Sequence, residues 1–215
     1  MSQQPDLARE RGLWAQGYVR VAGLDEAGRG AWAGPVVAAA VVLPPDVPGL
    51  SENLDPVRDS KLLSPLRRER CYRLILQHAL DCGVGLVSSA EIDRIGIVPA
   101  TRLAMVKALD ALASPPDYLL IDFVTLPQVP VPQCAAPKAD LHLLSVSAAS
   151  VVAKVSRDRW MIDLDKRLPG YGMARHKGYG TRQHLAALRD LGATSQHRHS
   201  YAPIRAIDEA HRARP

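Results

Sequence analysis

The chain has 215 residues, a length at which a single folded domain buries roughly 70% of its unfolded surface. Its apolar fraction of 47% and charged fraction of 23% exclude disordered and collagen-like chains. The longest apolar run, residues 31–43, is interrupted by Gly34 and Pro35 and is shorter than the ~18 residues needed to cross a bilayer. We therefore predict one domain over residues 1–215 that has no contact with a membrane.

The N-terminus and the cysteines indicate a cytoplasmic protein. Residues 1–16 carry charges of both signs and lack the apolar segment of a secretory signal. The three cysteines, Cys71, Cys82 and Cys134, are odd in number and show no CxxC spacing, which argues against a disulfide framework and a zinc knuckle. We expect them to be packing residues.

Positive charge is concentrated toward the C-terminus. The formal net charge is +5, but residues 154–215 hold 13 Lys and Arg against 6 Asp and Glu. Such a surplus favours a polyanionic partner, because cationic side chains displace counterions from phosphates. Solvated helix faces produce a similar asymmetry, so the charge alone does not decide between the two.

The first half of the chain predicts strands on either side of a glycine-rich turn. Apolar, partly β-branched segments within residues 18–43 indicate two paired strands. Residues 44–63 are rich in Pro, Asp, Ser and Gly, which is typical of a loop. Ser64 is a suitable N-cap for a helix over about 65–80, and a third strand is predicted over 83–89.

The second half continues this alternation. Helices are predicted over 90–96 and 99–113, followed by an apolar strand over 118–122. Residues 125–137 contain four prolines, which indicates a loop or sheet edge leading to a last strand-like piece. Residues 145–166 lack Gly and Pro and predict a long helix.

A glycine-rich loop over 168–180 and two short helices complete the basic C-terminal part. Alternating strands and helices indicate an α/β layer fold, and the first two strands, adjacent in sequence, are expected to be antiparallel. The sequence therefore predicts a mixed sheet.

Four acidic residues follow predicted strands or precede the long helix: Asp25, Glu26, Asp122 and Asp140. A buried carboxylate is costly unless a cation or a hydrogen-bond donor neutralises it. Oxygen ligands without His or Cys suit Mg²⁺, and two such ions about 4 Å apart can activate water for phosphodiester hydrolysis. Each acid alone is more often a cap or a surface residue, so the metal-site hypothesis depends on their context.

The first acidic pair lies in the motif GLDEAGRG, where Gly28 and Gly30 flank Arg29. Two glycines in three residues allow positive φ and let backbone N–H groups face a ligand oxygen. A plain tight turn between two strands explains the same residues, and both interpretations stay open at this point.

Seven motifs in order resemble the ribonuclease HII family over nearly residues 18–207. They are GLDEAGRG, AGPVVAAAVVL, DSKLLS, YLLID, SAASVVAKVSRD, HKGYGT and HRHSYAPIR. Each is weak alone, but together and in this order they are specific. The resemblance implies a ribonuclease H-like fold: a five-stranded mixed sheet flanked by helices over about 18–166, and a helical substructure over about 167–210 that closes over the substrate.

The resemblance also implies roles for individual residues. The family's metal-binding acidic quartet, its backbone motif that contacts the ribose 2′-hydroxyl, and its tyrosine near the junction ribose have counterparts here. In that order they are Asp25, Glu26, Asp122 and Asp140; Gly28, Arg29 and Gly30; and Tyr179. By the same resemblance Lys61 and Lys154 contact phosphates. From the residues alone, a turn residue between two glycines is the favoured interpretation of Tyr179, and Lys154 is equally a solvated charge.

The implied activity is that of a metal-dependent endonuclease. It would use two Mg²⁺ or Mn²⁺ ions, with Asp25 bridging them, to hydrolyse the RNA strand of RNA·DNA hybrids. It would also cut 5′ of ribonucleotides embedded in duplex DNA, leaving 3′-hydroxyl and 5′-phosphate ends. By analogy we expect a monomer, and binding of a replication clamp to the C-terminal tail is left open.

The sequence departs from the family pattern at Ala31, Leu62, Phe123 and Ala139, where Pro, Lys, Gly and Gly are usual. None of these changes removes an expected ligand, but the bulky Phe123 is expected to alter the backbone beside Asp122. Four histidines of the tail match no zinc spacing and are interpreted as structural or phosphate-facing: His176, His184, His197 and His199.

Three other functions are less consistent with the sequence. The sibling ribonuclease HIII family carries an added N-terminal domain, for which Asp25 comes too early in the chain. A hybrid-binding protein without catalysis would have no use for clustered anions facing phosphate. An interaction module lacks support because the sequence shows no exposed apolar stripe.

Overall fold

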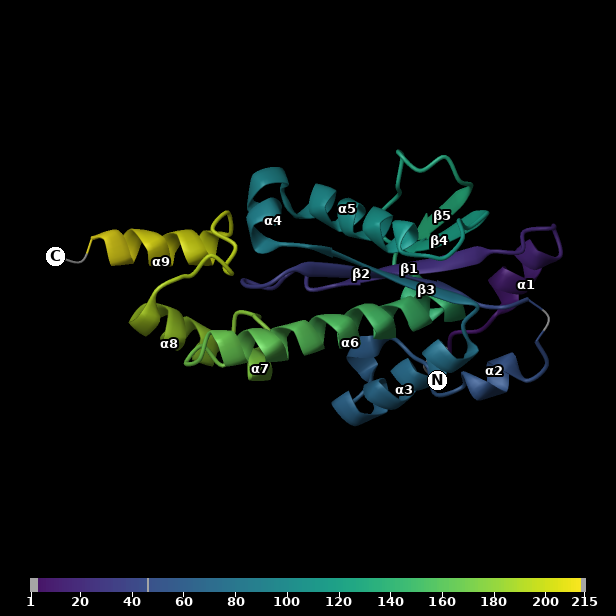
Figure 1. Cartoon of the computed structure of the whole chain (residues 1–215), viewed down its shortest axis with the longest axis horizontal. Coiled ribbons are helices and arrows are strands. Elements are labelled where there is room, and N and C mark those ends of the chain that lie inside the picture. The colour runs from purple at the N-terminus through teal and green to yellow at the C-terminus, as the bar shows by residue number, and fades with distance from the viewer. Residues whose placement is uncertain (1–3, 46, 214–215) are drawn as a thin grey trace.

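The computed structural model describes residues 4–45 and 47–213 and contains a five-stranded mixed sheet in the order β3-β2-β1-β4-β5 (Figure 1). β1 pairs antiparallel with β2 and parallel with β4. The mixed sheet and the antiparallel first pair are therefore confirmed. The strands are β1 (Val21–Ala27), β2 (Val36–Val42), β3 (Asp81–Val87), β4 (Tyr118–Asp122) and β5 (Gln133–Ala136).

Helices cover both faces of the sheet (Figure 1). α4 (Ser89–Ile95) and α5 (Ile97–Asp110) lie on one side, and α3 (Pro65–His78) and α6 (Leu144–Arg167) lie on the other. All seven residues of β2 are buried, as expected for a strand that is covered on both faces.

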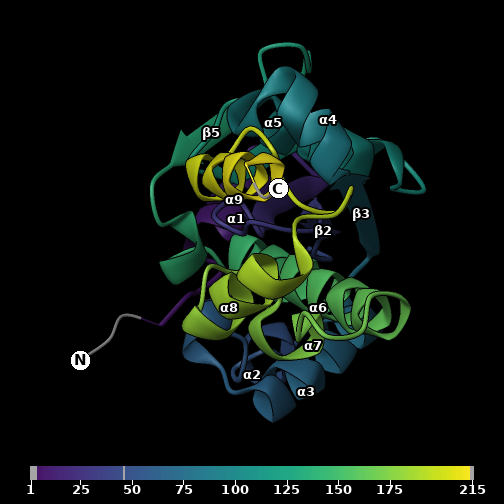
Figure 2. The ribbon, with the colours of Figure 1, turned by 90° about the vertical axis from the view of Figure 1, so that its left-hand side faces the viewer.

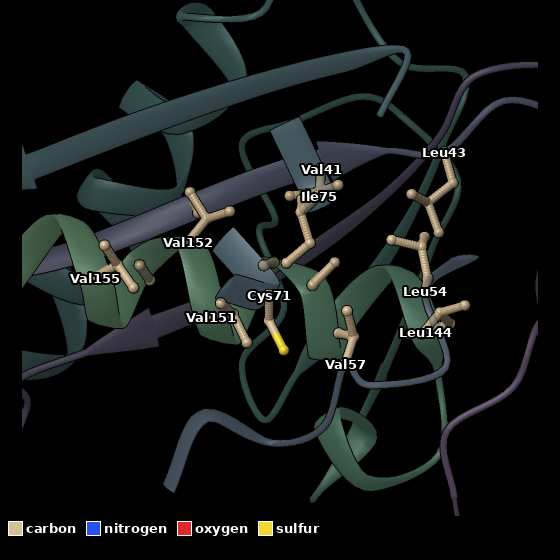
Figure 3. Close-up of a cluster of buried hydrophobic side chains, with 14 of the residues drawn as sticks. Val41, Leu43, Leu54, Val57, Cys71, Ile75, Leu144, Val151, Val152 and Val155 are labelled. Atoms are coloured by element: carbon tan, nitrogen blue, oxygen red, sulfur yellow. The ribbon is translucent and has the colours of Figure 1, made fainter. Parts of the chain in front are cut away.

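The core between β2, α3 and α6 is aliphatic. Figure 3 shows Val41 of β2 near Cys71 and Ile75 of α3 and Val151 and Val152 of α6. Burying side chains of this size stabilises the fold by about 1.5 to 3 kcal/mol each before the entropic cost of ordering them. Cys71 is a buried packing residue and all three cysteines are free thiols, as predicted.

The start of α6 is pressed against β1, the strand that carries Asp25. A Cβ on Gly23 would lie only 2.2 Å from the carbonyl carbon of Ser145, so only glycine permits this approach. The buried Glu10 of α1 (Ala8–Trp14) accepts hydrogen bonds from the Ser145 backbone N–H at 2.9 Å and from its hydroxyl at 2.7 Å. A carboxylate at a helix N-terminus is favourable, so α1 helps to place α6.

The C-terminal helices α7 (Met173–His176), α8 (Arg182–Leu191) and α9 (Ala202–Arg212) lie beyond one end of the sheet. Figure 2 views the molecule from that end, with α8 on the side of α6 and α9 on the side of α5. The two predicted short helices are confirmed as α8 and α9. The predicted glycine-rich loop is wrong in part, because its middle forms α7 between left-handed residues at Gly172 and Lys177.

Three of the four tail histidines form a buried cluster that supports α8. The rings of His176 and His184 stack with centroids 4.3 Å apart, and the Nε2 atoms of His184 and His197 are 3.1 Å apart. Burial lowers the pKa of His184 and of His197 to about 4. These histidines are neutral packing residues near pH 7, so the structural interpretation holds for them.

Other boundaries agree with the sequence to within a few residues. The region predicted as a loop over 44–63 also contains α2 (Leu50–Asn53) and a 3-10 turn, η1 (Ser60–Leu62), while the proline-rich segment ends in the sheet-edge strand β5. Across residues 4–45 and 47–213, no helix is long and apolar enough to cross a membrane.

Candidate active site

Two of the predicted acids lie side by side in the middle of the sheet. Asp25 lies in β1 and is 2% exposed, and Asp122 is the last residue of β4. The register pairs Leu24 with Ile121, so the next residues along these parallel strands are Asp25 and Asp122. The parallel pairing thus brings together carboxylates that are 97 residues apart in the sequence.

Asp140 joins them from the turn that leads into α6. It lies in η2 (Ala139–Leu141) and is 3% exposed. Oδ1 of Asp122 accepts a hydrogen bond of 2.9 Å from the Ala139 backbone N–H, which holds this turn against the end of β4. On its outer side, Asp140 Oδ2 lies 3.6 Å from Nζ of Lys61.

Burial and neighbouring carboxylates raise the pKa values of Asp25, Glu26 and Asp140. The pKa of Asp25 is well above its ordinary value because of burial first and the neighbouring Glu26 second, with Asp122 contributing. Burial also raises the pKa of Glu26, although Arg29 opposes that rise. The pKa of Asp140 is raised to about 6 by burial, by Asp59 and by Asp122. This crowding of buried acids is unfavourable unless a cation shares the site.

The donor atoms present fit a hard divalent metal. Asp25 Oδ2 and Glu26 Oε2 are buried and have no hydrogen-bond partner in the described structure. Buried oxygens without a partner are costly, and a cation with oxygen ligands satisfies them.

The four carboxylates are not arranged as a finished metal cage. No group of three or more His, Cys, Asp or Glu side chains in residues 4–45 and 47–213 converges on one metal position. The other carboxylate oxygens already have partners: Asp25 Oδ1 accepts from the Glu26 N–H at 2.6 Å, and Glu26 Oε1 binds Arg29 at 3.1 Å. Side-chain rotations would therefore have to accompany metal binding.

The loop with Gly28, Arg29 and Gly30 is held against the C-terminal part by two buried arginines that sequence reasoning missed. Arg198 donates to the carbonyl oxygens of Gly28 and Arg29, each at 2.7 Å. Arg157 donates to the carbonyls of Ala33, Pro35 and Lys177 at 3.1, 2.9 and 2.9 Å. Both lie inside recognised motifs, but from the sequence they entered only the count of positive charges in residues 154–215.

Gly28 leaves no room for a side chain. Its φ is +94°, and a Cβ there would lie 1.9 Å from Nε of the buried Arg157. We expect Gly28→Ala to lower the unfolding midpoint in urea, because it adds backbone strain and displaces Arg157. Gly30→Ala is the matched control for stability, since no atom of the described residues lies within 4 Å of a Cβ at Gly30. Equal midpoints for the two variants would contradict this account of the loop.

The substrate residues predicted from the resemblance gather around the acids. Tyr179 is half-buried, and Lys154 Nζ lies 5.7 Å from the centre of its ring. Lys61 is 72% exposed, whereas Lys154 forms a 2.6 Å ion pair with Asp158. A pocket of about 290 Å³ is lined by Asp25, Glu26, Ala27, Gly28, Arg29, Gly30, Ser60, Lys61, Asp122, Lys154 and Tyr179.

The turn that carries Lys61 contains further residues that the sequence analysis did not assign. Asp59 Oδ1 accepts from the Lys61 backbone N–H at 3.0 Å, and the hydroxyls of Ser60 and Ser150 are 2.9 Å apart. Arg68 donates to the Ser60 carbonyl at 3.0 Å. The serine pair fastens η1 to α6 and Arg68 fastens it to α3, and the motif DSKLLS was the available signal for this turn.

A pocket of buried acids at the centre of a mixed sheet in the order β3-β2-β1-β4-β5, with a helical C-terminal part beside it, is typical of a ribonuclease H-type hydrolase. The family model described as Ribonuclease HII matches residues 22–204. The chain belongs to the ribonuclease HII family.

Curated relatives support this membership. The ribonuclease HII of Geobacillus kaustophilus (strain HTA426) is 52% identical over 203 residues, which cover 94% of this chain and 75% of that protein. The ribonuclease HII of Chloroflexus aurantiacus (strain ATCC 29364 / DSM 637 / Y-400-fl) is 52% identical over 200 residues, covering 93% of this chain and 94% of the relative.

Solved structures agree in fold. Ribonuclease H2 from Pyrococcus horikoshii OT3 superposes with a TM-score of 0.75 at 29% identity, covering 91% of this chain and 100% of that one. The ribonuclease HII of Archaeoglobus fulgidus, solved in a complex with PCNA, gives a TM-score of 0.70 at 27% identity over 83% and 93% of the two chains. The predicted ribonuclease H-like fold is confirmed, and the chain is an enzyme of the ribonuclease H type.

Proposed function

We propose that this enzyme hydrolyses the RNA strand of RNA·DNA hybrids and cuts on the 5′ side of ribonucleotides embedded in duplex DNA. The proposal depends on two buried oxygens, one on Asp25 and one on Glu26, that have no hydrogen-bond partner among the described residues. They lie beside basic and glycine residues that line the same pocket. Acids at the base of a pocket and cations at its rim suit a phosphodiester with a divalent metal between them.

Asp25, Glu26, Asp122 and Asp140 are the residues that would hold two Mg²⁺ or Mn²⁺ ions. When bound, these ions would supply an activated water and neutralise charge on the phosphate and the leaving oxygen. The four acidic residues supply the negatively charged oxygen ligands that such ions require. Cleavage by water of the bond between phosphorus and the 3′ oxygen would leave a 3′-hydroxyl and a 5′-phosphate, and it needs no nucleophilic Ser or Cys.

The basic side chains at the rim bind the nucleic-acid backbone in this proposal. The side chain of Lys61 is 72% exposed and lies 3.6 Å from Asp140. When a metal ion neutralises Asp140, the ammonium group of Lys61 can leave that carboxylate and bind a phosphate. Lys154 is held by Asp158 at 2.6 Å, so it offers a fixed charge rather than a mobile one. Both charges favour a phosphate close to the acidic pocket.

Discrimination between ribose and deoxyribose would come from Gly28, Arg29, Gly30 and Tyr179. Arg198 binds the backbone carbonyls of the glycine loop on the side away from the pocket. The opposite side of the loop lines the pocket. Tyr179 lines the same pocket and presents a ring that can pack on a sugar. The 2′-hydroxyl, a donor and an acceptor, is the group that such contacts can distinguish.

The remaining expectations stay predictions: one domain over residues 1–215, a monomer and a cytoplasmic location. Clamp binding stays open, and the PCNA complex of the Archaeoglobus protein is a precedent for it among similar structures. A hybrid-binding protein without catalysis is the rival function, and it is disfavoured because all four acids lie at or beside one pocket.

The test is cleavage of a labelled DNA duplex that contains one ribonucleotide, with an all-DNA duplex and a full RNA·DNA hybrid alongside. Each is incubated with Mg²⁺, with Mn²⁺ and with EDTA. We expect a metal-dependent cut 5′ of the ribonucleotide and none in all-DNA. Cleavage of the hybrid alone would narrow the substrate to long hybrids, and binding without cleavage under every metal would leave the rival function.

A further inference from the structure

Phe123 is the chain's single phenylalanine, and its backbone has a conformation that aromatic residues rarely adopt. It follows Asp122 directly and has a φ of +68°. The Val124 N–H donates to the Asp122 carbonyl at 2.9 Å across it, so the three residues form the rare, strained form of γ-turn. The structure therefore holds an unfavourable backbone geometry next to a predicted metal ligand.

Burial does not compensate for this strain. Phe123 is 55% exposed, so it contributes little to the core. Strained backbone of this kind is commonly found at binding and catalytic sites, where the position of a side chain matters more than its stability. The contacts of the Phe123 ring indicate which neighbouring side chain it positions.

The ring lies under the guanidinium of Arg29. Cζ of Arg29 is 4.8 Å from the ring centroid, within the range of a cation–π interaction. On another side, the same guanidinium donates to Glu26 Oε1 at 3.1 Å. Arg29 is thus held by a carboxylate of the acidic pocket and by an aromatic ring at its rim.

These two contacts respond differently when the pocket is in use. A metal ion bound to Glu26 would compete with Arg29 for the negative charge of that carboxylate. The ion pair between Glu26 and Arg29 therefore weakens when a cation is present. The ring carries no formal charge to be neutralised, and its contact with Arg29 remains. Arg29 then stays at the rim with its charge available to a phosphate.

We propose that Phe123 is a positioning residue that holds the Arg29 guanidinium at the rim of the acidic pocket to receive a backbone phosphate of the nucleic acid. This inference rests on the proposed function. It gives a function to Phe123, which stands where the family usually has glycine. That function requires an aromatic ring, and a bulky aliphatic side chain would not replace it.

The test measures the Kd of a labelled RNA·DNA hybrid, by fluorescence anisotropy, for Phe123→Leu, Phe123→Gly and Phe123→Tyr. The measurement is made with Ca²⁺, a divalent cation that takes oxygen ligands, and in EDTA for comparison. Loss of the aromatic face in the first two should weaken binding about two- to fivefold, and tyrosine should bind like the original chain. Val19→Ala is the control, because Val19 is 56% exposed and precedes β1 at the end away from Asp25.

Unfolding in urea separates positioning from structural support. Phe123→Gly relieves the strain at φ +68°, so its unfolding midpoint should equal or exceed that of the original chain while binding weakens. A structural role alone would lower stability and binding together. Phe123→Leu keeps the comparison usable if the glycine variant folds poorly.

A double-mutant cycle with Arg29→Gln identifies the residue through which the ring acts. In that background, Phe123→Leu should have no further effect on the Kd. An equal loss in both backgrounds would overturn the proposal and indicate that the ring stacks on the nucleic acid directly. A Phe123→Leu variant that binds like the original chain would also overturn it, whereas an original chain that neither binds nor cuts hybrid would instead refute the proposed function.

Discussion

Asp25→Asn is expected to lower the rate of hybrid cleavage by about a thousandfold or more while leaving hybrid binding largely intact. Asp25 is the most central of the acids, and one of its buried oxygens has no hydrogen-bond partner in the described structure. Stabilisation of the transition state by metal is worth several kcal/mol, and each 1.36 kcal/mol is a factor of ten in rate. Single-turnover cleavage in Mg²⁺ and anisotropy with the same hybrid measure the two quantities.

The same substitution is expected to raise stability in EDTA at pH 8. The pKa of Asp25 is raised above its value in the unfolded chain, chiefly by burial and then by Glu26. A carboxyl group of this kind contributes stability below its unfolded pKa of about 3.8, and that contribution is lost as the pH rises through the folded pKa. Asparagine cannot ionise, so its advantage should appear at pH 8 and shrink toward pH 4.

Urea unfolding of both proteins at the two pH values tests this. Asp110→Asn serves as the control, because Asp110 is exposed at the end of α5 on the other side of the sheet. Full activity of Asp25→Asn would refute the assignment of Asp25. A variant that is inactive and also less stable at pH 8 would show that the carboxylate supports the fold rather than the chemistry.

Arg198→Ala is expected to destabilise the fold by about 3 to 5 kcal/mol. Its side chain is fully buried and donates to the carbonyls of Gly28, Arg29 and Gly34 and to the hydroxyl of Tyr201. Removing the guanidinium leaves the Gly34 carbonyl without a donor in the described structure and takes one donor each from the Gly28 and Arg29 carbonyls. A buried acceptor without a donor costs more than the hydrogen bond itself contributes. The glycine loop would lose its attachment to the C-terminal part, so hybrid binding should weaken as well.

Arg205→Ala provides a matched control because Arg205 is exposed on α9. Arg198→Lys should recover only part of the stability, since an ammonium cannot reproduce the planar arrangement of five donors. Unfolding in urea measures each effect. If Arg198→Ala were as stable as Arg205→Ala, the buried arginine would not be what holds the loop.

The sequence by itself determined the order of the elements and the identity of the acids. The apolar run of β4 predicted that strand to the residue, and Ser64 before Pro65 marked the start of α3, because strand hydrophobicity and helix capping are local signals. Asp122 was recognised because it ends such a strand. The motifs were sufficient to identify the family before any contact was known.

Short or unusual elements were harder to predict from local signals. α1 and α2 have 7 and 4 residues, and η1 and η2 have 3 each, so they carry little periodicity of their own. They form because other parts of the chain hold them: Glu10 binds the start of α6, and Ser60 binds Ser150. The strained turn at Phe123 likewise depends on hydrogen bonds supplied by β4 and β5.

Only the tertiary structure decided which charged groups meet. Arg198 lies 170 residues from Gly28 in the sequence, yet it is the donor that holds the glycine loop. The family resemblance predicts phosphate contacts for Lys154 and Lys61. It did not predict their partners in the fold, which are Asp158 for Lys154 and Asp140 for Lys61. Composition records how many charges a chain has, whereas burial and distance determine their partners, and both are set only when distant segments pack together.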